Sequence, residues 1–488
     1  MSMNSVIRRV APVLLVAAAA GCADLDLTNP NEQTAESFWK TEQDAVLGIN
    51  ATYRGLQENG VYGRWLQFAF DVRSDIGVSR SPWGDLANFT QTVFTSYDFE
   101  VNRQLWNHHY GAIFRANQVI DQVPAIEMDP ALRNRIVGEA KFLRALLYFN
   151  LVNLYGNPAL NLKTSTATDR PAQATPAEVW TQVEKDLTEA MAVLPVSYSG
   201  NDVGRATRGA AQALLGRAHL QQKEWAAAAA QLQAVIGSGQ YGLAADYRSN
   251  FTETGDNNAE SVFEVQFGGP DVLADGSRGQ NMIKMLGPCA PNGPSFCDGE
   301  ATDWYAAQFN ETTTGGGADP RMDATLFTRG TAYGRPYSDY FGSAEGRKFW
   351  IKYGEFYKNG QDWDNPINVK VMRLGGLLLL HAEAALMAGQ EPAARASLNR
   401  VRERAGLAAR TTPITLADVE REQLRELGFE NERWLFLFRH DYLTDPGKFA
   451  VLVSHDPQFA GWKATQALLP IPNTEDDLND NVTQNPGY

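Results

Sequence analysis

The chain has 488 residues, of which 44% are hydrophobic, 10% aromatic and 20% charged, and its formal net charge is −14. This composition allows a large buried core and excludes a disordered tail or linker protein. The negative charge repels phosphate groups, which argues against nonspecific binding of nucleic acid or of anionic lipid through basic patches. Three cysteines are too few for a disulfide-stapled scaffold.

Residues 1–21 have the pattern of a secretory signal peptide. Two arginines precede an apolar run from Val10 to Ala20, and small residues stand directly before Cys22. This arrangement resembles a bacterial lipobox, in which the cysteine thiol receives a lipid and becomes the first mature residue. The alternative is an ordinary signal peptide that is cut nearby and leaves Cys22 free. We expect lipidation of Cys22.

The polar segment 22–35 is expected to be a flexible tether for the lipid anchor. Its acidic residues Asp24 and Asp26 resemble the surface-export signal of Bacteroidetes-type lipoproteins, which implies an outer-membrane, cell-surface location. No later segment reaches the roughly 18 uncharged apolar residues that cross a bilayer. The sequence therefore predicts contact with the membrane through the anchor only.

The rest of the chain, 36–488, carries helical hairpins. From Ile136 to Leu154 apolar residues recur every three or four positions, and a second helix begins at Thr175-Pro176, a helix cap followed by proline. The same plan recurs over 207–236 and 371–405, and residues 36–58 with 101–123 form a further candidate pair. These patterns predict a mainly α fold with about four helix pairs of the tetratricopeptide type.

The predicted repeats occupy about 36–245 and 367–440, and a C-terminal segment follows over 441–488. Between them, over about 246–366, helical periodicity gives way to glycine, proline, asparagine and aspartate. Such a long irregular segment is typical of a functional subdomain. One short strand is expected at Glu264–Phe267.

Cys289 and Cys297 lie close together in this insertion. In an oxidising envelope we expect them to form a local disulfide, which would rigidify a loop rich in turns. A metal site with two cysteine ligands is the alternative, although no histidine or third cysteine lies near in the sequence.

A series of short motifs, each weak alone, follows one order over almost the whole chain after the signal peptide. They include Cys22 with Asp24-Leu25, Asn29-Pro30-Asn31, Phe38-Trp39-Lys40-Thr41, Tyr155-Gly156, Gly204-Arg205-Ala206-Thr207, Asp319-Pro320-Arg321, Asn399-Arg400-Val401-Arg402, Phe429-Glu430, Leu469-Pro470-Ile471-Pro472 and Gln484 to Tyr488. In these motifs the chain resembles the SusD/RagB family of nutrient-binding outer-membrane lipoproteins. One departure is Phe436, where the family usually has an aspartate, and it leaves the local helix pairing open.

The resemblance implies a SusD-like fold and a surface protein without enzymatic activity or a cofactor. Such a protein sits as a lid over a SusC-type TonB-dependent outer-membrane barrel, captures a nutrient, commonly a glycan or oligosaccharide, and passes it on for uptake. A peptide is the alternative cargo. Two other classes compete with this hypothesis: a surface hydrolase on a helical scaffold, and a structural adaptor whose repeats bind only protein.

Enzymatic motifs are missing from the sequence: it has no nucleophile elbow, zincin helix, phosphate loop or dinucleotide fingerprint. His108-His109 is the one histidine pair, and adjacent helical side chains point about 100° apart, so we expect hydrogen-bonding roles and no metal. Glu383, Arg402 and Glu430 fall within predicted helices, where buried ion pairs or caps explain them better than catalysis.

Aromatic side chains in loops are the best candidates for ligand contact, because sugar CH faces pack against rings while polar groups at the rim bind hydroxyls. Two loop regions supply them: Trp65, Arg73, Asp75, Trp83 and Asn88 at 59–100, and Trp304, Tyr305, Tyr337, Trp350 and Trp363 in the long insertion. The alternative is that a given ring fills a small core beneath its loop. Four tryptophans within helical patterns are expected to be core or helix-contact residues: Trp39, Trp180, Trp225 and Trp434.

Overall fold

The computed structural model describes residues 38–268, 279–289, 295–340, 346–355 and 365–488. The predictions for the signal peptide, Cys22, the tether and Trp363 lie outside the described residues. Among the residues described, no helix combines the length and the apolarity needed to span a bilayer.

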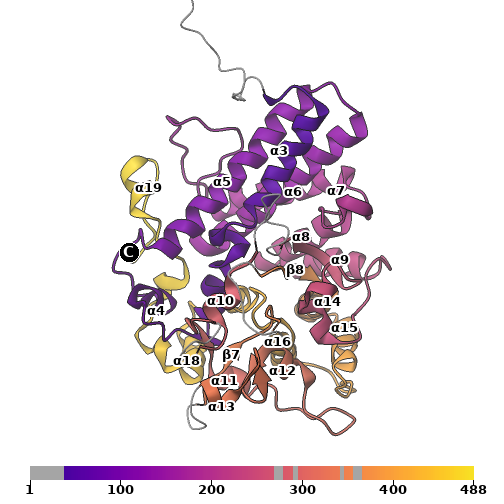
Figure 1. The fold of residues 1–488 in the computed structure, drawn as a ribbon, viewed down its shortest axis with the longest axis vertical. Helices are drawn as coiled ribbons and strands as arrows, with labels where there is room; N and C mark the ends of the chain where they lie inside the picture. The colour runs from indigo at the N-terminus through magenta and orange to yellow at the C-terminus, as the bar shows by residue number, and fades with distance from the viewer. Residues whose placement is uncertain (1–37, 269–278, 290–294, 341–345, 356–364) are drawn as a thin grey trace, which may run out of the picture.

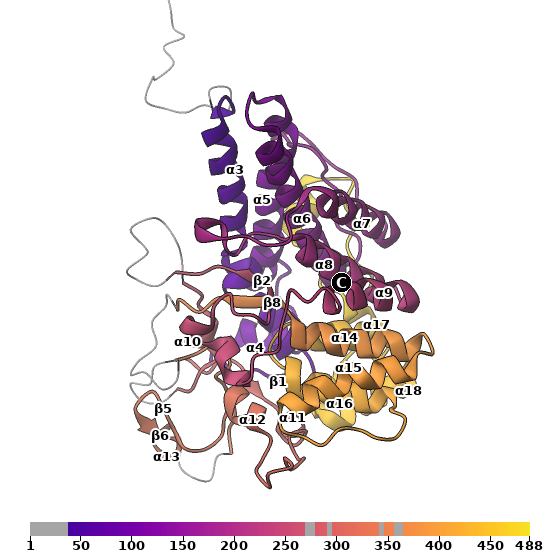
Figure 2. The same ribbon diagram turned by 90° about the vertical axis from the view of Figure 1, so that its right-hand side faces the viewer.

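Stacked helix pairs form one side of the molecule, and Figure 2 shows them as successive layers. The pairs are α3 (Glu42–Gly55) with α5 (Glu100–Gln122), α6 (Pro130–Tyr155) with α7 (Pro176–Val193), α8 (Arg208–Gln221) with α9 (Trp225–Ile236), and α14 (Leu374–Met387) with α15 (Glu391–Arg404). Helix α9 packs against α14 although the whole long insertion separates them in the sequence. The four predicted helix pairs are present, and the contact between α9 and α14 makes the array continuous in space.

Short polar side chains start several of these helices. Thr41 and Thr175 each accept a hydrogen bond from the third helical residue, whose acidic side chain bonds back to the threonine amide. Such capping boxes satisfy backbone groups that have no partner inside the helix. Helix α6 ends at Gly156, whose φ of +76° favours glycine.

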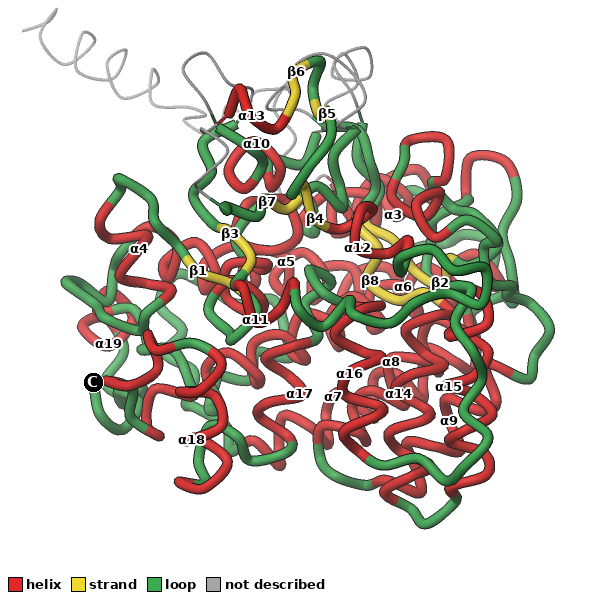
Figure 3. The backbone as a smooth tube through the Cα atoms, turned by 90° about the horizontal axis from the view of Figure 1, so that it is seen from below, coloured by secondary structure: helices red, strands yellow, loops and turns green. Residues whose placement is uncertain are grey.

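A small antiparallel sheet connects the two loop regions. Its strand order is β1-β3-β7-β4, with Gly77 of β1 opposite Ala301 of β3. Figure 3 shows this sheet between the repeat helices and the outer loops that carry α10 (Met282–Leu286) and α13 (Tyr337–Tyr340). The strands of the described residues are β1 (Gly77–Val78), β2 (Ser261–Val265), β3 (Glu300–Ala301), β4 (Leu326–Phe327), β5 (Thr331–Ala332), β6 (Arg335–Pro336), β7 (Phe349–Trp350) and β8 (Val369–Arg373).

The strand predicted at Glu264–Phe267 is β2, which begins earlier, at Ser261, and pairs with β8. The loop regions also contain short helices and two π-helical turns that the sequence did not predict. These are the turns Asn59–Gly63 and Phe68–Val72, and the helices α4 (Gly84–Thr90), α10 (Met282–Leu286), α11 (Asp303–Ala306), α12 (Pro320–Thr325) and α13 (Tyr337–Tyr340).

The C-terminal part of the chain returns to the first half of the molecule. After α16 (Leu416–Leu427), α17 (Arg433–Arg439) and α18 (Pro446–His455), the chain reaches α19 (Asn473–Leu478) near α5 (Figure 1). The Leu469 amide donates to the Leu154 carbonyl at 2.7 Å, and the Asn485 side chain donates to the Tyr155 carbonyl at 2.9 Å. The end of α6 thus depends on residues from the far end of the sequence.

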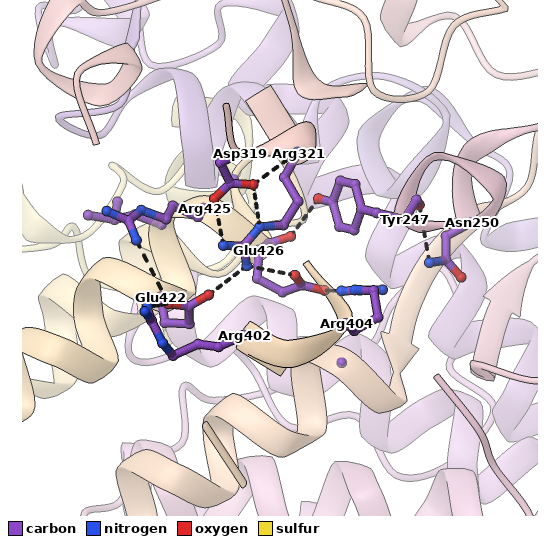
Figure 4. A network of polar contacts seen from close by, with 12 residues as sticks. Tyr247, Asn250, Asp319, Arg321, Arg402, Arg404, Glu422, Arg425 and Glu426 are labelled. Carbon is purple, nitrogen blue, oxygen red and sulfur yellow. Dashed lines mark hydrogen bonds and ion pairs between the residues drawn. The ribbon is translucent and has the colours of Figure 1, made fainter. Parts of the chain in front are cut away.

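A buried network of ion pairs joins the long insertion to the last helices (Figure 4). Arg321 of α12 contacts Asp319 at 2.7 Å, Glu422 at 2.7 Å and Glu426 at 3.1 Å. Arg373 at the end of β8 contacts Glu426 at 2.5 Å and Glu430 at 2.7 Å. Each buried carboxylate in this group faces a cation, which offsets the cost of removing it from water.

The predicted structural roles of Glu383, Arg402 and Glu430 are confirmed. Glu383 pairs with Arg439 at 2.5 Å, Arg402 pairs with Glu422 at 2.9 Å, and Glu430 binds both Arg373 and Lys352. Glu430 lies in the turn after α16 and not on a helix. Phe436, where the chain departs from the family pattern, is buried in α17, which packs against α8.

Candidate ligand-binding site

The described residues predicted to contact a ligand divide into buried and accessible side chains. Five are at most 1% exposed: Trp65, Arg73, Asp75, Tyr305 and Trp350. Four retain accessible surface: Trp83, Asn88, Trp304 and Tyr337. Only the second group can present a side chain to a ligand in this conformation, and ligand contact by its members stays a prediction.

The buried aromatic residues support the loops from below. The Trp65 indole donates to Gln104 of α5 at 2.9 Å, and its ring lies edge-on to Trp83 with 6.2 Å between centroids. Trp350 stacks on Phe429 at 4.8 Å. Trp65 and Trp350 therefore fill small cores beneath the loops and are not available to a ligand.

The buried Arg73 and Tyr305 also have structural partners. The Arg73 guanidinium lies 3.9 Å from the centroid of the Trp434 ring and donates to the Ala467 carbonyl at 3.3 Å. The Tyr305 hydroxyl donates to the Leu424 carbonyl at 3.1 Å. Of the four tryptophans expected in helix contacts, Trp434 and Trp180 are buried, and Trp39 and Trp225 are partly buried against the core.

Trp83 and Trp304 follow opposite ends of the β1–β3 pair. The strands run antiparallel, with Gly77 opposite Ala301, so the chain after β1 and the chain after β3 leave in opposite directions. Near Trp304 the imidazole of His455 stacks on the indole at 3.8 Å. One face of the Trp304 ring is therefore already covered by protein.

Asp298 organises the loop that carries Trp83. Its carboxylate accepts from the Ser81 hydroxyl at 2.6 Å, and the same hydroxyl accepts from the Trp83 amide at 3.1 Å. Burial raises the pKa of Asp298 above its usual range, while the hydrogen bond from Ser81 opposes this shift. Two residues earlier in the sequence, Phe296 exposes 47% of its surface. We call the accessible rings of Trp83 and Phe296, together with the buried Ser81 and Asp298 that join their segments, the Trp83–Phe296 surface.

A disulfide bond between Cys289 and Cys297 restrains the segment that carries Phe296, as the sequence predicted. Within this segment the Phe296 amide donates to the Lys284 carbonyl of α10 at 2.9 Å. Tyr337 is tied to the same region, because its hydroxyl donates to the Arg347 carbonyl at 2.5 Å and the Arg347 guanidinium contacts the Cys297 sulfur. Arg347 thus links Tyr337 to the segment that carries Cys297 and Phe296.

Phe296 was not among the residues predicted from the sequence, because that prediction rested on tryptophan and tyrosine rings. A local signal was present, since Phe296 directly precedes Cys297 in the segment between the two cysteines.

The histidine pair of α5 has hydrogen-bonding roles. His108 Nδ1 accepts from the Gly60 amide at 2.9 Å, and buried His109 lies 2.6 Å from the Leu105 carbonyl. Elsewhere in the described part of the chain, Glu184, His219 and Glu224 are the one group that brings three metal-ligand atoms within 4.8 Å of one another. The His219–Glu224 contact of 2.6 Å is also an ordinary hydrogen bond.

Known proteins match the chain over nearly all of its length. The sequence profile described as "Starch-binding associating with outer membrane" matches residues 25–220, and the profile of the SusD family matches residues 237–488. A SusD-like protein, P38, from Formosa agariphila is 25% identical over 442 residues, which are 83% of each chain.

Solved structures agree with the predicted fold. A SusD superfamily protein from Bacteroides vulgatus superimposes with a TM-score of 0.80 at 24% identity, over 92% of this chain and 100% of that one. A laminarin-binding SusD-like protein has a TM-score of 0.76 at 29% identity, over the same shares of the two chains. The mainly helical, SusD-like fold expected from the motifs is confirmed, and the chain belongs to the SusD family.

Proposed function

We propose that the protein is a cell-surface lipoprotein that binds a glycan without breaking bonds and delivers it to a SusC-type TonB-dependent outer-membrane transporter. Lipidation at Cys22 would hold it at the outer membrane. The description of the family that matches residues 25–220 supports this location, and the laminarin-binding relative supports a glycan over a peptide as cargo.

The observation that carries the proposal is the Trp83–Phe296 surface. Two accessible rings lie on segments that Asp298 joins, one of them held by the disulfide and the other by Ser81. Such rings pack against the CH faces of sugars, and neighbouring polar groups bind the hydroxyls. Because hydrogen bonds and the disulfide fix both segments beforehand, little conformational entropy is lost when a glycan binds.

The test is isothermal titration calorimetry with laminarin oligosaccharides and starch oligosaccharides on the wild type, Trp83→Ala and Phe296→Ala. We expect each variant to bind the preferred glycan at least about tenfold more weakly, which corresponds to about 1.4 kcal/mol. Leu478→Ala, which truncates an apolar side chain that is 63% exposed on α19, is the matched control. Unchanged affinity in both ring variants would refute the site.

Anchoring and delivery need separate measurements. Metabolic labelling with a radioactive fatty acid should mark the wild type and leave Cys22→Ser unlabelled. Purification of the lipidated protein in mild detergent should recover an outer-membrane barrel with it. Recovery of the unlabelled, soluble wild type without a barrel would contradict this part of the proposal.

A further inference from the structure

A cavity of about 460 Å³ lies away from the Trp83–Phe296 surface, between the end of α3, the loop after α7 and strand β2. Figure 2 shows α3 running towards β2 at this side of the molecule. The volume of the cavity is in the range of small-molecule sites, about 300–1,000 Å³. None of the residues of the Trp83–Phe296 surface lines it.

The walls of the cavity are fixed by hydrogen bonds and ion pairs. Arg205 binds Asn50 at 2.8 Å, Glu139 at 3.0 Å and Asp202 at 2.6 Å. Gly204 beside it has a φ of +96°, and a Cβ there would lie 2.5 Å from the Gln266 side chain, so the loop can approach β2 this closely only with glycine. The cavity is therefore preformed.

Several polar atoms of the residues that line this cavity have no hydrogen-bond partner among the described residues. The Gln57 amide nitrogen donates to the Gln266 carbonyl at 2.7 Å, whereas its buried Oε1 atom has no hydrogen-bond partner among the described residues. The exposed Arg54 guanidinium and the exposed Asn201 side chain likewise have none within the described part of the chain. At the accessible surface of the cavity, Arg54 offers donors to a ligand, and the Asn201 amide offers both donors and an acceptor.

The charges around the cavity favour one negative charge on that ligand. Arg205 and Arg135 together balance Glu139 and Asp202, and Glu264 of β2 is balanced by Lys370. Among the described residues that line the cavity, Arg54 is left as the unbalanced charge at the opening. One guanidinium matches one carboxylate, whereas phosphate sites are typically built at helix N-termini, and α3 contributes its C-terminal end.

Stacking contributes little here. The Tyr53 ring, the one aromatic side chain that lines the cavity among the described residues, has Arg205 over it at 5.6 Å. Recognition would therefore rest on side-chain amides and a guanidinium, which bind hydroxyl and carboxylate oxygens.

We propose that this cavity is a second binding site, which takes a hydroxyl-rich ligand of monosaccharide size bearing one carboxylate, of the uronic acid class. Arg54 binds the carboxylate, and the exposed Asn201 amide donates to a ring oxygen and accepts from a ligand hydroxyl. The site does not depend on the Trp83–Phe296 surface.

The test compares glucuronate and galacturonate with neutral glucose by ligand-observed NMR and calorimetry on the full mature chain. We expect saturable binding of a uronate and at least about tenfold weaker binding of glucose. Arg54→Gln should reduce uronate affinity to that of glucose, and Asn201→Ala should weaken it as well. Both positions are exposed, so these variants should fold, which a thermal melt checks.

Two further variants test whether the uronate binds in this cavity or elsewhere on the protein. Arg400→Gln removes an exposed arginine on α15 outside the cavity and should leave uronate binding unchanged. The double variant Trp83→Ala/Phe296→Ala should also leave it unchanged, even if it loses the glycan. Equal binding of glucose and uronate, full affinity in Arg54→Gln, or no saturation at about 10 mM would overturn the proposal.

Discussion

Asp75 and Arg433 form a two-pronged ion pair that joins the first loop region to α17. Arg433 Nε lies 2.7 Å from one carboxylate oxygen of Asp75, and Nη2 lies 2.7 Å from the other. His455 Nδ1 is 2.9 Å from Asp75, and its ring stacks on Trp304. Asp75, which we predicted to contact a ligand, therefore supports Trp304 from inside the protein.

Asp75→Ala should lower the free energy of unfolding by about 3–5 kcal/mol, because it leaves the Arg433 guanidinium buried without its main counterion. The exposed pair Asp323–Arg329 offers a matched control, and Asp323→Ala should cost at most about 1 kcal/mol. Urea denaturation at pH 7 measures both. Equal costs for the two variants would contradict a special role for the buried pair.

The same pair predicts a loss of stability in acid. Burial raises the pKa of Asp75, but the charges and hydrogen bonds of Arg433 and His455 outweigh it and lower the pKa to about 2, from 3.8 for a free side chain. The ionised Asp75 carboxylate therefore stabilises the fold fully above about pH 4, and this stabilisation is lost as the pH falls towards 2. The difference in the free energy of unfolding between the wild type and Asp75→Asn should therefore decrease as the pH falls from about 4 to about 2.

Asp71 should show the opposite pH dependence. Its carboxylate accepts from the Asn431 amide at 2.8 Å, its other oxygen has no partner among the described residues, and burial raises its pKa to about 7. The unfolded chain loses this proton near pH 4 and the folded protein near pH 7, so Asp71 destabilises the fold as pH rises between these values.

Asp71→Asn should therefore be more stable than the wild type at pH 8, by up to about 4 kcal/mol at 1.4 kcal/mol per pKa unit. The gain should shrink as pH falls towards 4. Chemical denaturation at several pH values measures this difference. A difference that stays constant with pH would show that Asp71 does not titrate in this range.

Gly60 should not tolerate a larger residue. A Cβ there would lie 1.9 Å from the Gln104 carbonyl oxygen of α5, so Gly60→Ala must move backbone against backbone. We expect a loss of about 3 kcal/mol. Gly84, in the same loop region, has nothing within 4 Å of its Cβ position, and Gly84→Ala should have little effect on the melting temperature. Similar melting temperatures for both variants would mean that this contact is looser than the structure shows.

The disulfide should matter more for the glycan than for the fold as a whole. Cys289→Ser/Cys297→Ser opens a loop with a sequence separation of 8, for which we expect a cost of about 2 kcal/mol. Because Phe296 lies within that loop, glycan affinity should fall in calorimetry as well. Unchanged affinity would indicate that the contacts to Lys284 alone hold Phe296.

The helix pairs could be predicted because their signals are local. Apolar spacing over 136–154 and the cap at Thr175 specify α6 and α7 without reference to distant residues. Whether a single aromatic ring is exposed, in contrast, depends on residues that are distant in the sequence. Trp65 and Trp83 are the same residue type in one loop region, yet Trp65 is buried and bonded to Gln104 of α5, while Trp83 keeps accessible surface.

The same limit applies to Trp350, which was a reasonable candidate by sequence although Phe429 covers its ring in the fold. The family motifs themselves report mainly on structure. Asp319, Arg321 and Arg402 belong to the buried ion-pair network, where partners of both arginines come from α16. Such motifs identify the fold well and the ligand poorly.

The return of the C-terminal segment to α6 has a consequence for how the polypeptide matures. The carbonyls of Leu154 and Tyr155 accept hydrogen bonds from Leu469 and Asn485. The carboxylate of Asp75 pairs with Arg433, which is also late in the sequence. A chain that emerges amino end first can form the internal hydrogen bonds of α6 early, but these contacts must wait for its last residues. The end of α6 and the Asp75–Arg433 pair therefore reach their final arrangement only in the finished polypeptide.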